Sequence, residues 1–290
     1  MRRAIEESMR AVTAEMVRKV YPKRDQWSHK GDSGRVLVIG GSRRYRGAPA
    51  LVGLAALRTG ADIAVIAAPE SSADVVSSFS PNLITEPLEG DYINPDNVKR
   101  LLSIAENFDS VVIGNGMGRM SKSMDAVICF LKAVQKPCVI DGDGLHLLAG
   151  NKSVLRPGWI ITPHAHEFYS LSGIKLTKSV EERMRHTEKF SGEFKATVLL
   201  KGHKDVISEG KASFINSTGN PYMTVGGTGD VLAGICGALL AMKLKAIDAA
   251  AAGAYLSGAA GDIAARRTSP GMLATDVIDR IPDAIRSVLD

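Results

Sequence analysis

The segment with the clearest chemical content is glycine-rich and reads TVGGTGD over residues 224–230, ahead of an apolar run over residues 231–240. Three glycines within four positions let the backbone turn tightly and bring its N–H groups close to a ligand. A helix that begins here directs its free amides and the positive end of its dipole at the same place, which favours phosphate. Asp230 would repel that phosphate unless it has a task, and we expect the task to be accepting a proton from a hydroxyl group. The alternative is an ordinary acidic residue at a helix N-terminus, which stabilises a helix by about 0.3–1 kcal/mol.

Two common nucleotide-binding motifs are not completed. The sequence contains no GxxxxGK[ST] loop, and residues 114–118 read GNGMG, which matches GxGxG but not GxGxxG. An ordinary P-loop enzyme and a dehydrogenase with the usual dinucleotide fingerprint are therefore disfavoured. By itself, the segment 114–118 is equally compatible with a glycine turn between a strand and a helix.

Further polar and glycine-rich segments follow expected strands, over residues 40–50, 141–144, 162–167 and 200–205. Ligands of α/β sheets bind outside the carboxyl ends of the strands, so these segments are candidates for one site. Asp141 and Asp143 resemble a carboxylate pair for acid–base work. At positions i and i+2 of a strand end they are expected to point apart, so that at least one of them is structural.

Short apolar runs alternate with helical stretches along the sequence. This alternation predicts an α/β fold with a mostly parallel central sheet and helices on both faces, which would position these segments. Strands are expected over residues 36–41, 63–67, 110–114, 138–141, 159–163 and 197–201, with a helix over 49–59. Glu209-Gly210 separates two β-like runs, 204–208 and 211–216, which indicates a hairpin. Helices over 229–242, 246–266 and 275–289 complete a single domain over residues 31–290.

Residues 1–30 are expected to form an N-terminal helical extension. Ile5, Met9, Val12, Met16 and Val20 recur at spacings of three or four and make one helical stripe over residues 1–20. This helix could pack on its own chain or on a neighbouring subunit, and the sequence favours neither.

Composition excludes several classes of protein. The net charge of +5 comes without a dense basic tract, which disfavours a nucleic-acid partner. No apolar stretch approaches the roughly 20 residues that span a bilayer, and the charged N-terminus lacks a signal-peptide core. We therefore expect a cytoplasmic protein without a membrane partner. The three cysteines, Cys129, Cys138 and Cys236, lie far apart among apolar residues, which predicts buried, inert thiols.

Taken in order, these segments closely resemble those of the ADP/ATP-dependent NAD(P)H-hydrate dehydratases of the ribokinase-like superfamily. The resemblance is carried by residues 29–36, 40–61, 114–118, 141–144, 162–167 and 226–230, and it extends from about His29 to the C-terminus. Many members carry an epimerase domain at the N-terminus. About 30 residues cannot hold it, so a stand-alone dehydratase is expected.

The resemblance implies repair of a damaged cofactor, in which NADH or NADPH has added water across a ring double bond. Asp230 would accept the proton of the resulting 6-hydroxyl while that oxygen takes the terminal phosphoryl group of ADP. Backbone N–H groups of Gly227, Thr228 and Gly229 would stabilise the transferring group. Loss of phosphate from the ester then restores the nicotinamide, and AMP is the other product.

The resemblance also assigns the binding residues. Contacts to the hydrated dinucleotide are expected from Ala48, Ala50, Gly116, Gly118, His164 and Asp230, and contacts to the nucleotide from Lys201, Gly202, His203, Lys204, Asp205 and Gly229. Mg²⁺ is expected as the cofactor, held largely through water, with Glu167 in its water shell. For Glu167 the alternative is a surface carboxylate after a turn, and for Lys201 an exposed lysine at the start of a hairpin.

Two other functions stay open. A hydroxymethylpyrimidine or thiazole kinase of the same superfamily would share the glycine–aspartate segment but phosphorylate another acceptor. A non-catalytic nucleotide sensor is disfavoured by the intact Asp230. The resemblance favours ADP over ATP for a stand-alone chain and suggests a homotetramer, whereas the preference between NADH and NADPH hydrates is not readable.

Overall fold

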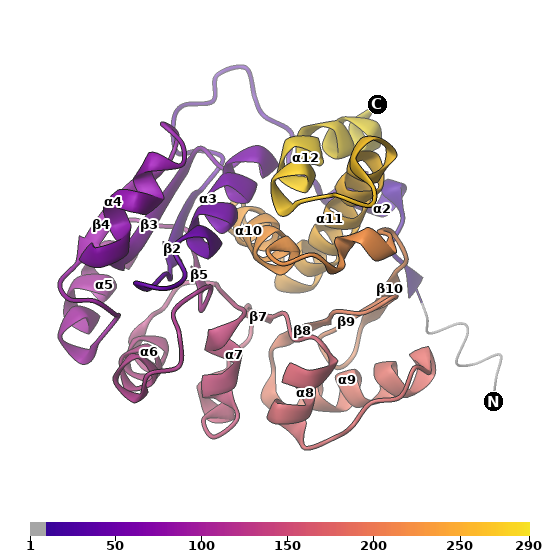
Figure 1. Cartoon of the computed structure of the whole chain (residues 1–290). Coiled ribbons are helices and arrows are strands. Elements are labelled where there is room, and N and C mark those ends of the chain that lie inside the picture. Colours follow the sequence, from indigo (N-terminus) through magenta and orange to yellow (C-terminus); the bar gives the residue numbers. More distant parts are fainter. Residues whose placement is uncertain (1–9) are drawn as a thin grey trace.

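Residues 10–290 of the computed structural model are described here, and they form one ten-stranded sheet packed between helices (Figure 1). The strand order is β1-β10-β9-β8-β7-β6-β5-β2-β3-β4, in which β9 runs antiparallel to β8 and β10 and the other neighbours are parallel. The strands are β1 Arg10–Ala11, β2 Arg35–Ile39, β3 Ile63–Pro69, β4 Ile84–Leu88, β5 Ser110–Ile113, β6 Cys138–Ile140, β7 Ile160–Ile161, β8 Thr197–Leu200, β9 Asp205–Ser208 and β10 Ser213–Asn216. The expected α/β fold with a mostly parallel sheet is confirmed.

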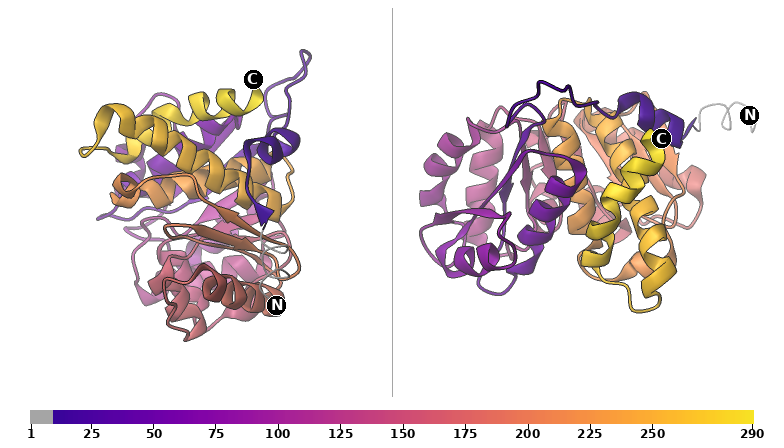
Figure 2. Two further views of the ribbon diagram at one scale, coloured as in Figure 1. Left: turned by 90° about the vertical axis from the view of Figure 1, so that its right-hand side faces the viewer. Right: turned by 90° about the horizontal axis from the view of Figure 1, so that it is seen from above.

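Helices cover both faces of the sheet (Figures 1 and 2). One face carries α2 Ala14–Val20, α3 Gly47–Thr59, α4 Glu70–Ser78, α10 Thr228–Ala241, α11 Ala246–Thr268 and α12 Ala274–Leu289, and the other carries α5 Val98–Ala105, α6 Ser121–Ala133, α7 Asp143–Leu148, α8 Ala165–Ser172 and α9 Val180–Phe194. Short 3₁₀ turns lie at Pro95–Asn97, Lys152–Val154 and Pro221–Thr224. Along β2, Val36 and Val38 join one core while Leu37 and Ile39 join the other. Burial on both faces explains why these strands read as continuous apolar runs.

Helix α10, which begins at the glycine-rich segment, packs tightly against α3 and the sheet. A Cβ atom added to Gly234 would overlap the backbone carbonyl oxygen of Val52 in α3, and one added to Gly237 would overlap the Val112 side chain in β5. These two glycines let the backbone of α10 approach its neighbours closely. That approach sets where the first turn of α10, and with it Asp230, stands relative to the strand ends.

We expect Gly234→Ala to destabilise the protein by about 1–3 kcal/mol, because the added methyl meets backbone rather than a flexible side chain. Helix propensity alone would give the opposite sign, since alanine is favoured over glycine by about 1 kcal/mol. The matched control is Gly192→Ala in α9, where the nearest atom to an added Cβ is the Gly210 Cα at 3.7 Å. Chemical denaturation measures both free energies of unfolding, and equal stability of the two variants would contradict the packing argument.

The N-terminal extension differs from the expected single helix. Residues 1–9, with Ile5 and Met9, lie outside the described residues; Arg10–Ala11 form a strand parallel to β10, and α2 begins only at Ala14. The free edge of β10 offers backbone partners that a stripe of apolar residues does not reveal. Helix α2 packs on α11 and α12 of its own chain, so the first of the two sequence alternatives applies to it.

Other expectations have mixed outcomes. The hairpin, the six expected strands and the four expected helices are present, and their ends differ from the predicted ends by at most a few residues. Edge strand β4 was not predicted. Cys138 and Cys236 are buried as expected, but Cys129 is exposed on the outer side of α6, so the prediction for that thiol was wrong. Within residues 10–290, no helix combines the length and the apolarity needed to cross a bilayer.

Candidate active site

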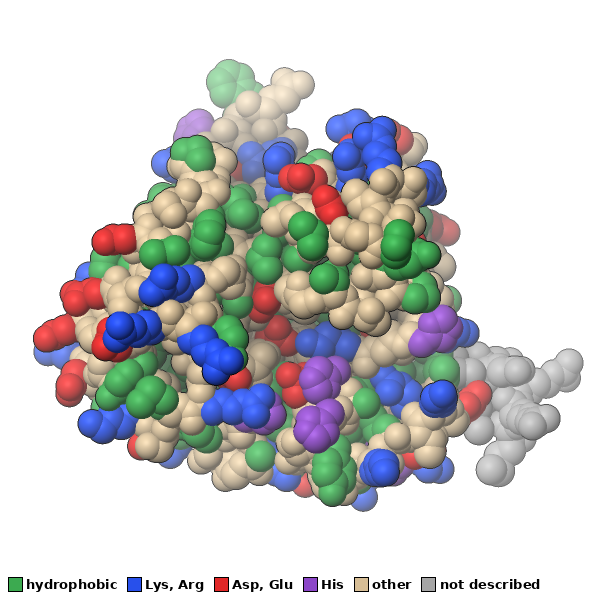
Figure 3. Space-filling model, viewed as in Figure 1, with side chains coloured by type: hydrophobic (Ala, Val, Ile, Leu, Met, Phe, Trp, Pro, Cys, Tyr) green, Lys and Arg blue, Asp and Glu red, His purple; other side chains and the backbone are tan. Residues whose placement is uncertain are grey.

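The chemically active side chains converge at the carboxyl ends of four parallel strands. Asn115, Asp141, Thr162 and Lys201 follow the ends of β5, β6, β7 and β8 in turn, and Asp230 faces them from the first turn of α10. In the space-filling view this face is hollowed near its centre, with acidic, basic and histidine side chains around the hollow (Figure 3). The strand ends therefore form one site, as the parallel topology predicts.

Gly114 allows two of these strand ends to come together. Its φ of 120° lies in the region that favours glycine, and an added Cβ would overlap the carbonyl oxygen of Asp141. The glycine thus brings the residues after β5 against the residues after β6. Asn115 and Asp141 are held within hydrogen-bond reach as a result.

A continuous hydrogen-bonded chain links the candidate base to a lysine. The Asn115 Nδ2 group donates to Asp230 Oδ1 at 2.7 Å and to Asp141 Oδ2 at 2.9 Å. The other oxygen of Asp141 accepts from Thr162 Oγ1 at 2.6 Å and from Lys201 Nζ at 2.9 Å. Asn115 and Asp141 are 1% and 2% exposed, so the chain is shielded from solvent and its electrostatic interactions are strong.

The electrostatics of this chain suit a base at neutral pH. Burial raises the pKa of Asp230, and the nearby carboxylate of Asp141 raises it further. The hydrogen bond from Asn115 and the charge of Lys201 act in the opposite direction, and the pKa of Asp230 settles at about 7. A carboxylate with such a pKa is partly ionised near neutrality and can accept a proton in the transition state.

Lys201 remains a cation at the same pH. Burial would lower its pKa, but the carboxylates of Asp141 and Glu167 outweigh burial and raise the pKa above its ordinary value. An added Cβ on Gly229 would lie 3.3 Å from Lys201 Nζ, which places the ammonium group beside the first turn of α10. A bound phosphate can therefore meet the lysine and the helix N-terminus together. The alternative of an exposed hairpin lysine is wrong.

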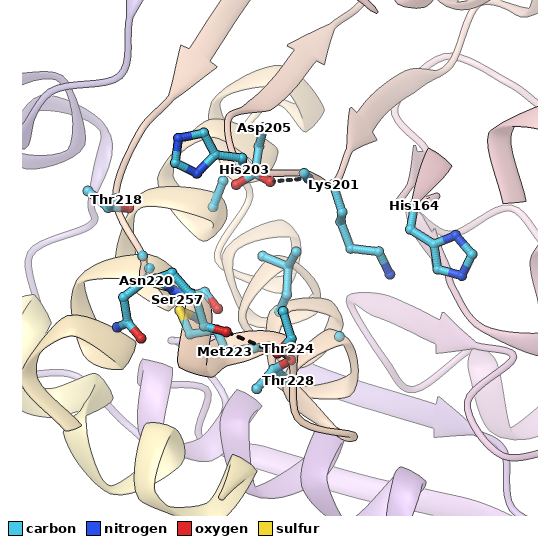
Figure 4. Close-up of a pocket in the computed structure, with 17 residues that line it drawn as sticks. His164, Lys201, His203, Asp205, Thr218, Asn220, Met223, Thr224, Thr228 and Ser257 are labelled. Carbon is cyan, nitrogen blue, oxygen red and sulfur yellow. Dashed lines mark hydrogen bonds between the residues drawn. The ribbon is translucent and has the colours of Figure 1, made fainter. Parts of the chain in front are cut away.

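A cavity of about 720 Å³ opens beside this lysine (Figure 4). Of the residues assigned to the nucleotide, five line it: Lys201, Gly202, His203, Asp205 and Gly229. Lys204 is exposed and does not line the cavity, so its contact to the nucleotide stays a prediction. Residues that sequence reasoning missed complete the wall: Thr218, Asn220, Met223, Thr224 and Ser257. They come from the segment after β10 and from α11, and their residue types alone do not signal a site.

The glycine-rich segment is built as a cradle at the start of α10. Gly227 has a φ of 98° and precedes the helix, and an added Cβ would lie 2.7 Å from the Leu51 side chain. The Thr228 hydroxyl donates to the backbone carbonyl of Met223 at 2.8 Å, so the side chain braces the turn. What Thr228 can offer to a ligand is its backbone.

The residues assigned to the hydrated dinucleotide separate into two groups. His164 lines the cavity, and its Nδ1 accepts from the backbone N–H groups of His166 and Glu167 at 3.1 and 3.2 Å. The proton of the neutral ring therefore belongs on Nε2, which can donate to a ligand. By contrast Ala48, Ala50, Gly116 and Gly118 do not line this cavity, and Ala50, in α3, is 3% exposed; their contacts to the dinucleotide stay predictions.

Gly116 and Ala48 nevertheless belong to the same side of the site. An added Cβ on Gly116 would lie 3.0 Å from the Ala48 Cβ, so the loop after β5 contacts the start of α3. Asp143 accepts from the Gly118 backbone at 2.9 Å and from Arg119 at 3.1 Å, and thereby holds this loop. Asp141 and Asp143 do point to different partners, as expected, and Asp143 is the structural one.

Glu167 is 8% exposed, so the alternative of a surface carboxylate is wrong. Its Oε2 accepts from the His164 backbone N–H at 2.8 Å in a capping box at the start of α8. Within residues 10–290, no group of three or more His, Cys, Asp or Glu side chains is arranged to hold a metal ion. A metal contact through water is still compatible with the fixed carboxylate.

Comparison with known proteins adds an independent result. A family model described as NAD(P)H-hydrate dehydratase matches residues 36–283. The bifunctional NAD(P)H-hydrate repair enzyme of Methanothermobacter thermautotrophicus is 42% identical over 269 residues, which is 91% of this chain and 52% of that protein. The ADP-dependent (S)-NAD(P)H-hydrate dehydratase of Nitrosopumilus maritimus is 36% identical over 286 residues, covering 96% of this chain and 97% of that protein.

Among solved structures, the ADP/ATP-dependent NAD(P)H-hydrate dehydratase of Bacillus subtilis, co-crystallised with ATP and Mg²⁺, superimposes with a TM-score of 0.83. It is 26% identical, and the match covers 97% of this chain and 99% of that one. This chain thus spans about half the length of the bifunctional relatives that it matches and nearly the whole length of the shorter ones.

Proposed function

Since this chain belongs to the NAD(P)H-hydrate dehydratase family, we propose that it converts (6S)-NAD(P)H hydrate back to NAD(P)H with ADP as phosphoryl donor, giving AMP and phosphate. One observation carries the proposal. Asp230, with a pKa of about 7, stands on the glycine cradle at the start of α10, next to Gly229, which lines the cavity, and the charge of Lys201 acts on it. A site that only bound nucleotide would gain nothing from a carboxylate facing phosphate.

The reaction follows from these positions in two steps. The 6-hydroxyl oxygen of the hydrate attacks the terminal phosphorus of ADP, the bond to the bridging oxygen breaks, and AMP leaves. Asp230 takes the hydroxyl proton; its Oδ1 is occupied by Asn115, so the proton goes to Oδ2. The C6–O bond of the ester then breaks as the ring nitrogen supplies its electron pair. The phosphate leaves with the bonding pair and takes a proton from the neighbouring ring carbon, which completes the double bond.

The chain's own groups supply the charge stabilisation that phosphoryl transfer requires. Lys201 remains cationic beside the cradle, and the backbone N–H groups of Gly227, Thr228 and Gly229 belong to a helix N-terminus. The cavity volume of about 720 Å³ is in the range of small-molecule sites, about 300–1,000 Å³. We assign this cavity to the nucleotide, with Gly202, His203 and Asp205 along its wall.

Mg²⁺ is part of the proposal because the residues present fit it. Carboxylates are the hard oxygen donors that this ion takes, and the capping box holds Glu167 in one position near Lys201. When bound, the ion would neutralise the phosphates of ADP. Glu167 would hold it through water. The homotetramer suggested by the resemblance is not tested by a single chain and stays a prediction.

The proposed function predicts that the purified protein restores the absorbance of reduced nicotinamide when it receives hydrated NADH, ADP and Mg²⁺. AMP and phosphate should form in amounts equal to the NADH recovered. Reactions without ADP, with ATP in place of ADP, and with hydrated NADPH show which donor and which dinucleotide the site accepts. Phosphorylation of a hydroxymethylpyrimidine or thiazole alcohol without recovery of absorbance would instead indicate a kinase, and binding without turnover a sensor.

A further inference from the structure

Asn115 occupies an unusual position between two carboxylates. Its two amide hydrogens are divided, one to Asp230 Oδ1 at 2.7 Å and one to Asp141 Oδ2 at 2.9 Å. A primary amide carries two donors on one nitrogen, so a single Asn can serve both acids at once. Within residues 10–290, the bond from Asn115 is the only hydrogen bond recorded to the Asp230 side chain.

Resting on the proposed function, we propose that Asn115 is a positioning residue for the base: it fixes Asp230 Oδ1, presents Oδ2 to the substrate hydroxyl, and holds two neighbouring carboxylates together. The GxGxG pattern over residues 114–118 depends on its glycines and by itself gives Asn115 no role.

The hydrogen-bonding groups of the amide are only partly satisfied at this position. Asn115 is 1% exposed, and its carbonyl oxygen Oδ1 is buried without a hydrogen-bond partner. A buried acceptor left unsatisfied is destabilising, and an apolar side chain of similar volume would avoid that cost. What an apolar side chain cannot do is donate to the two acids.

Asn115 also connects the base to the nucleotide side of the site. Asp141 is held on its other oxygen by Thr162 and Lys201, so the amide extends an anchored structure toward Asp230. The charged groups that act on Asp230 are Asp141 after β6, Lys201 after β8 and Asp143 in α7. The two carboxylates disfavour the ionised form of Asp230, whereas the charge of Lys201 and the hydrogen bond from Asn115 favour it.

The test is the replacement of Asn115 by leucine, which has a similar volume and no donor. Without the amide, the pKa of Asp230 rises, because a hydrogen bond that stabilises its ionised form is lost while burial and Asp141 remain. We expect the acidic limb of the kcat–pH profile to move up by about one pH unit, and kcat at pH 7 to fall about 10-fold or more. Part of the loss should be recovered at pH 9, whereas the KM for ADP should change little.

Two further variants define the comparison. Asn115→Ser keeps a single donor and should give a smaller shift of the limb, and it replaces the leucine variant if the latter does not fold. Asn97→Leu is the matched control, since Asn97 is 4% exposed and bonds to the backbone of Asn94 and Glu89, away from the site. The control can lose stability but should leave the limb in place.

A readout without turnover separates this inference from the proposed function. In protein with ¹³C-labelled aspartate carboxyls and no substrate, the Asp230 resonance, assigned by its loss in Asp230→Asn, should titrate at higher pH in Asn115→Leu than in the wild type. If that shift is found while no variant dehydrates the hydrate, the proposed function fails and the positioning role stands. If the wild type is active and both the resonance and the kinetic limb stay in place in Asn115→Leu and Asn115→Ser, the positioning role is overturned.

Discussion

Asp230→Asn is expected to lower kcat by at least ~10²-fold, the usual scale for removal of a general base, while ADP still binds. The carboxamide has the same shape but cannot take the hydroxyl proton at neutral pH. Its oxygen can still accept the hydrogen bond that Asn115 now donates to Asp230 Oδ1, so the local structure is retained. Steady-state kinetics with hydrated NADH give kcat, and calorimetric titration gives the affinity for ADP.

The matched control is Asp248→Asn. Asp248 lies at the third position of α11, as Asp230 does in α10, but away from the strand ends. If Asp230 were only a favourable charge at a helix N-terminus, both variants would lose about 0.3–1 kcal/mol of stability and keep their activity. A near-normal rate in Asp230→Asn would remove the residue from the mechanism.

The same variant has a second signature in stability. The pKa of Asp230 is raised from 3.8 to about 7 in the folded protein, so between these pH values the folded chain holds a proton that the unfolded chain has lost. Its contribution to the free energy of unfolding therefore falls as the pH rises through that window. Asp230→Asn should be more stable than the wild type at pH 8, by up to about 4 kcal/mol, and nearly equal to it at pH 4. Urea denaturation at both pH values measures the difference, and a pH-independent difference would contradict the raised pKa.

Lys201→Met is expected to weaken ADP binding by about 10²-fold, because it removes the cation that we propose to contact the phosphates of ADP, and loss of one partner of a buried charge pair across a binding interface costs about 2–5 kcal/mol. Methionine keeps the length of the side chain but not the charge that lies 2.9 Å from Asp141 Oδ1. Loss of this cation also raises the pKa of Asp230, so kcat at pH 7 should fall as well. Calorimetric titration with ADP and the kcat–pH profile measure the two effects separately.

Lys204→Met serves as the control three residues further along the same strand connection. Lys204 is exposed and does not line the cavity, so we expect its affinity for ADP to stay within about 2-fold of the wild type. Equal losses in both lysine variants would mean that general positive charge, rather than the position of Lys201 beside the cradle, attracts the nucleotide.

Local patterns in the sequence were sufficient for most of the architecture. The strand predicted over residues 36–41 reads as buried because both of its faces are covered, and the helix predicted over 229–242 follows from a glycine-rich segment ahead of a long apolar run. The N-terminus was predicted less well. A stripe at spacings of three and four is compatible with helix throughout, yet Arg10–Ala11 pair with β10, and the availability of that edge depends on a hairpin about 200 residues away in the sequence.

The sequence by itself determined the acid on its glycine cradle and the strand ends that face it, because each is encoded in a few adjacent residues with a characteristic backbone requirement. Only the tertiary structure decided that Asn115 joins Asp230 to Asp141 and that Thr218 and Ser257 line the cavity beside Lys201, whereas Ala50 and Lys204 do not. The hydrogen bond from Asn115 to Asp141 spans 26 positions of the sequence, and the one from Asn115 to Asp230 spans 115. Both depend on how β5, β6 and α10 pack. The same packing produces the pKa of about 7 at Asp230, since burial and a second carboxylate are properties of the assembled site and not of the segment that carries the acid.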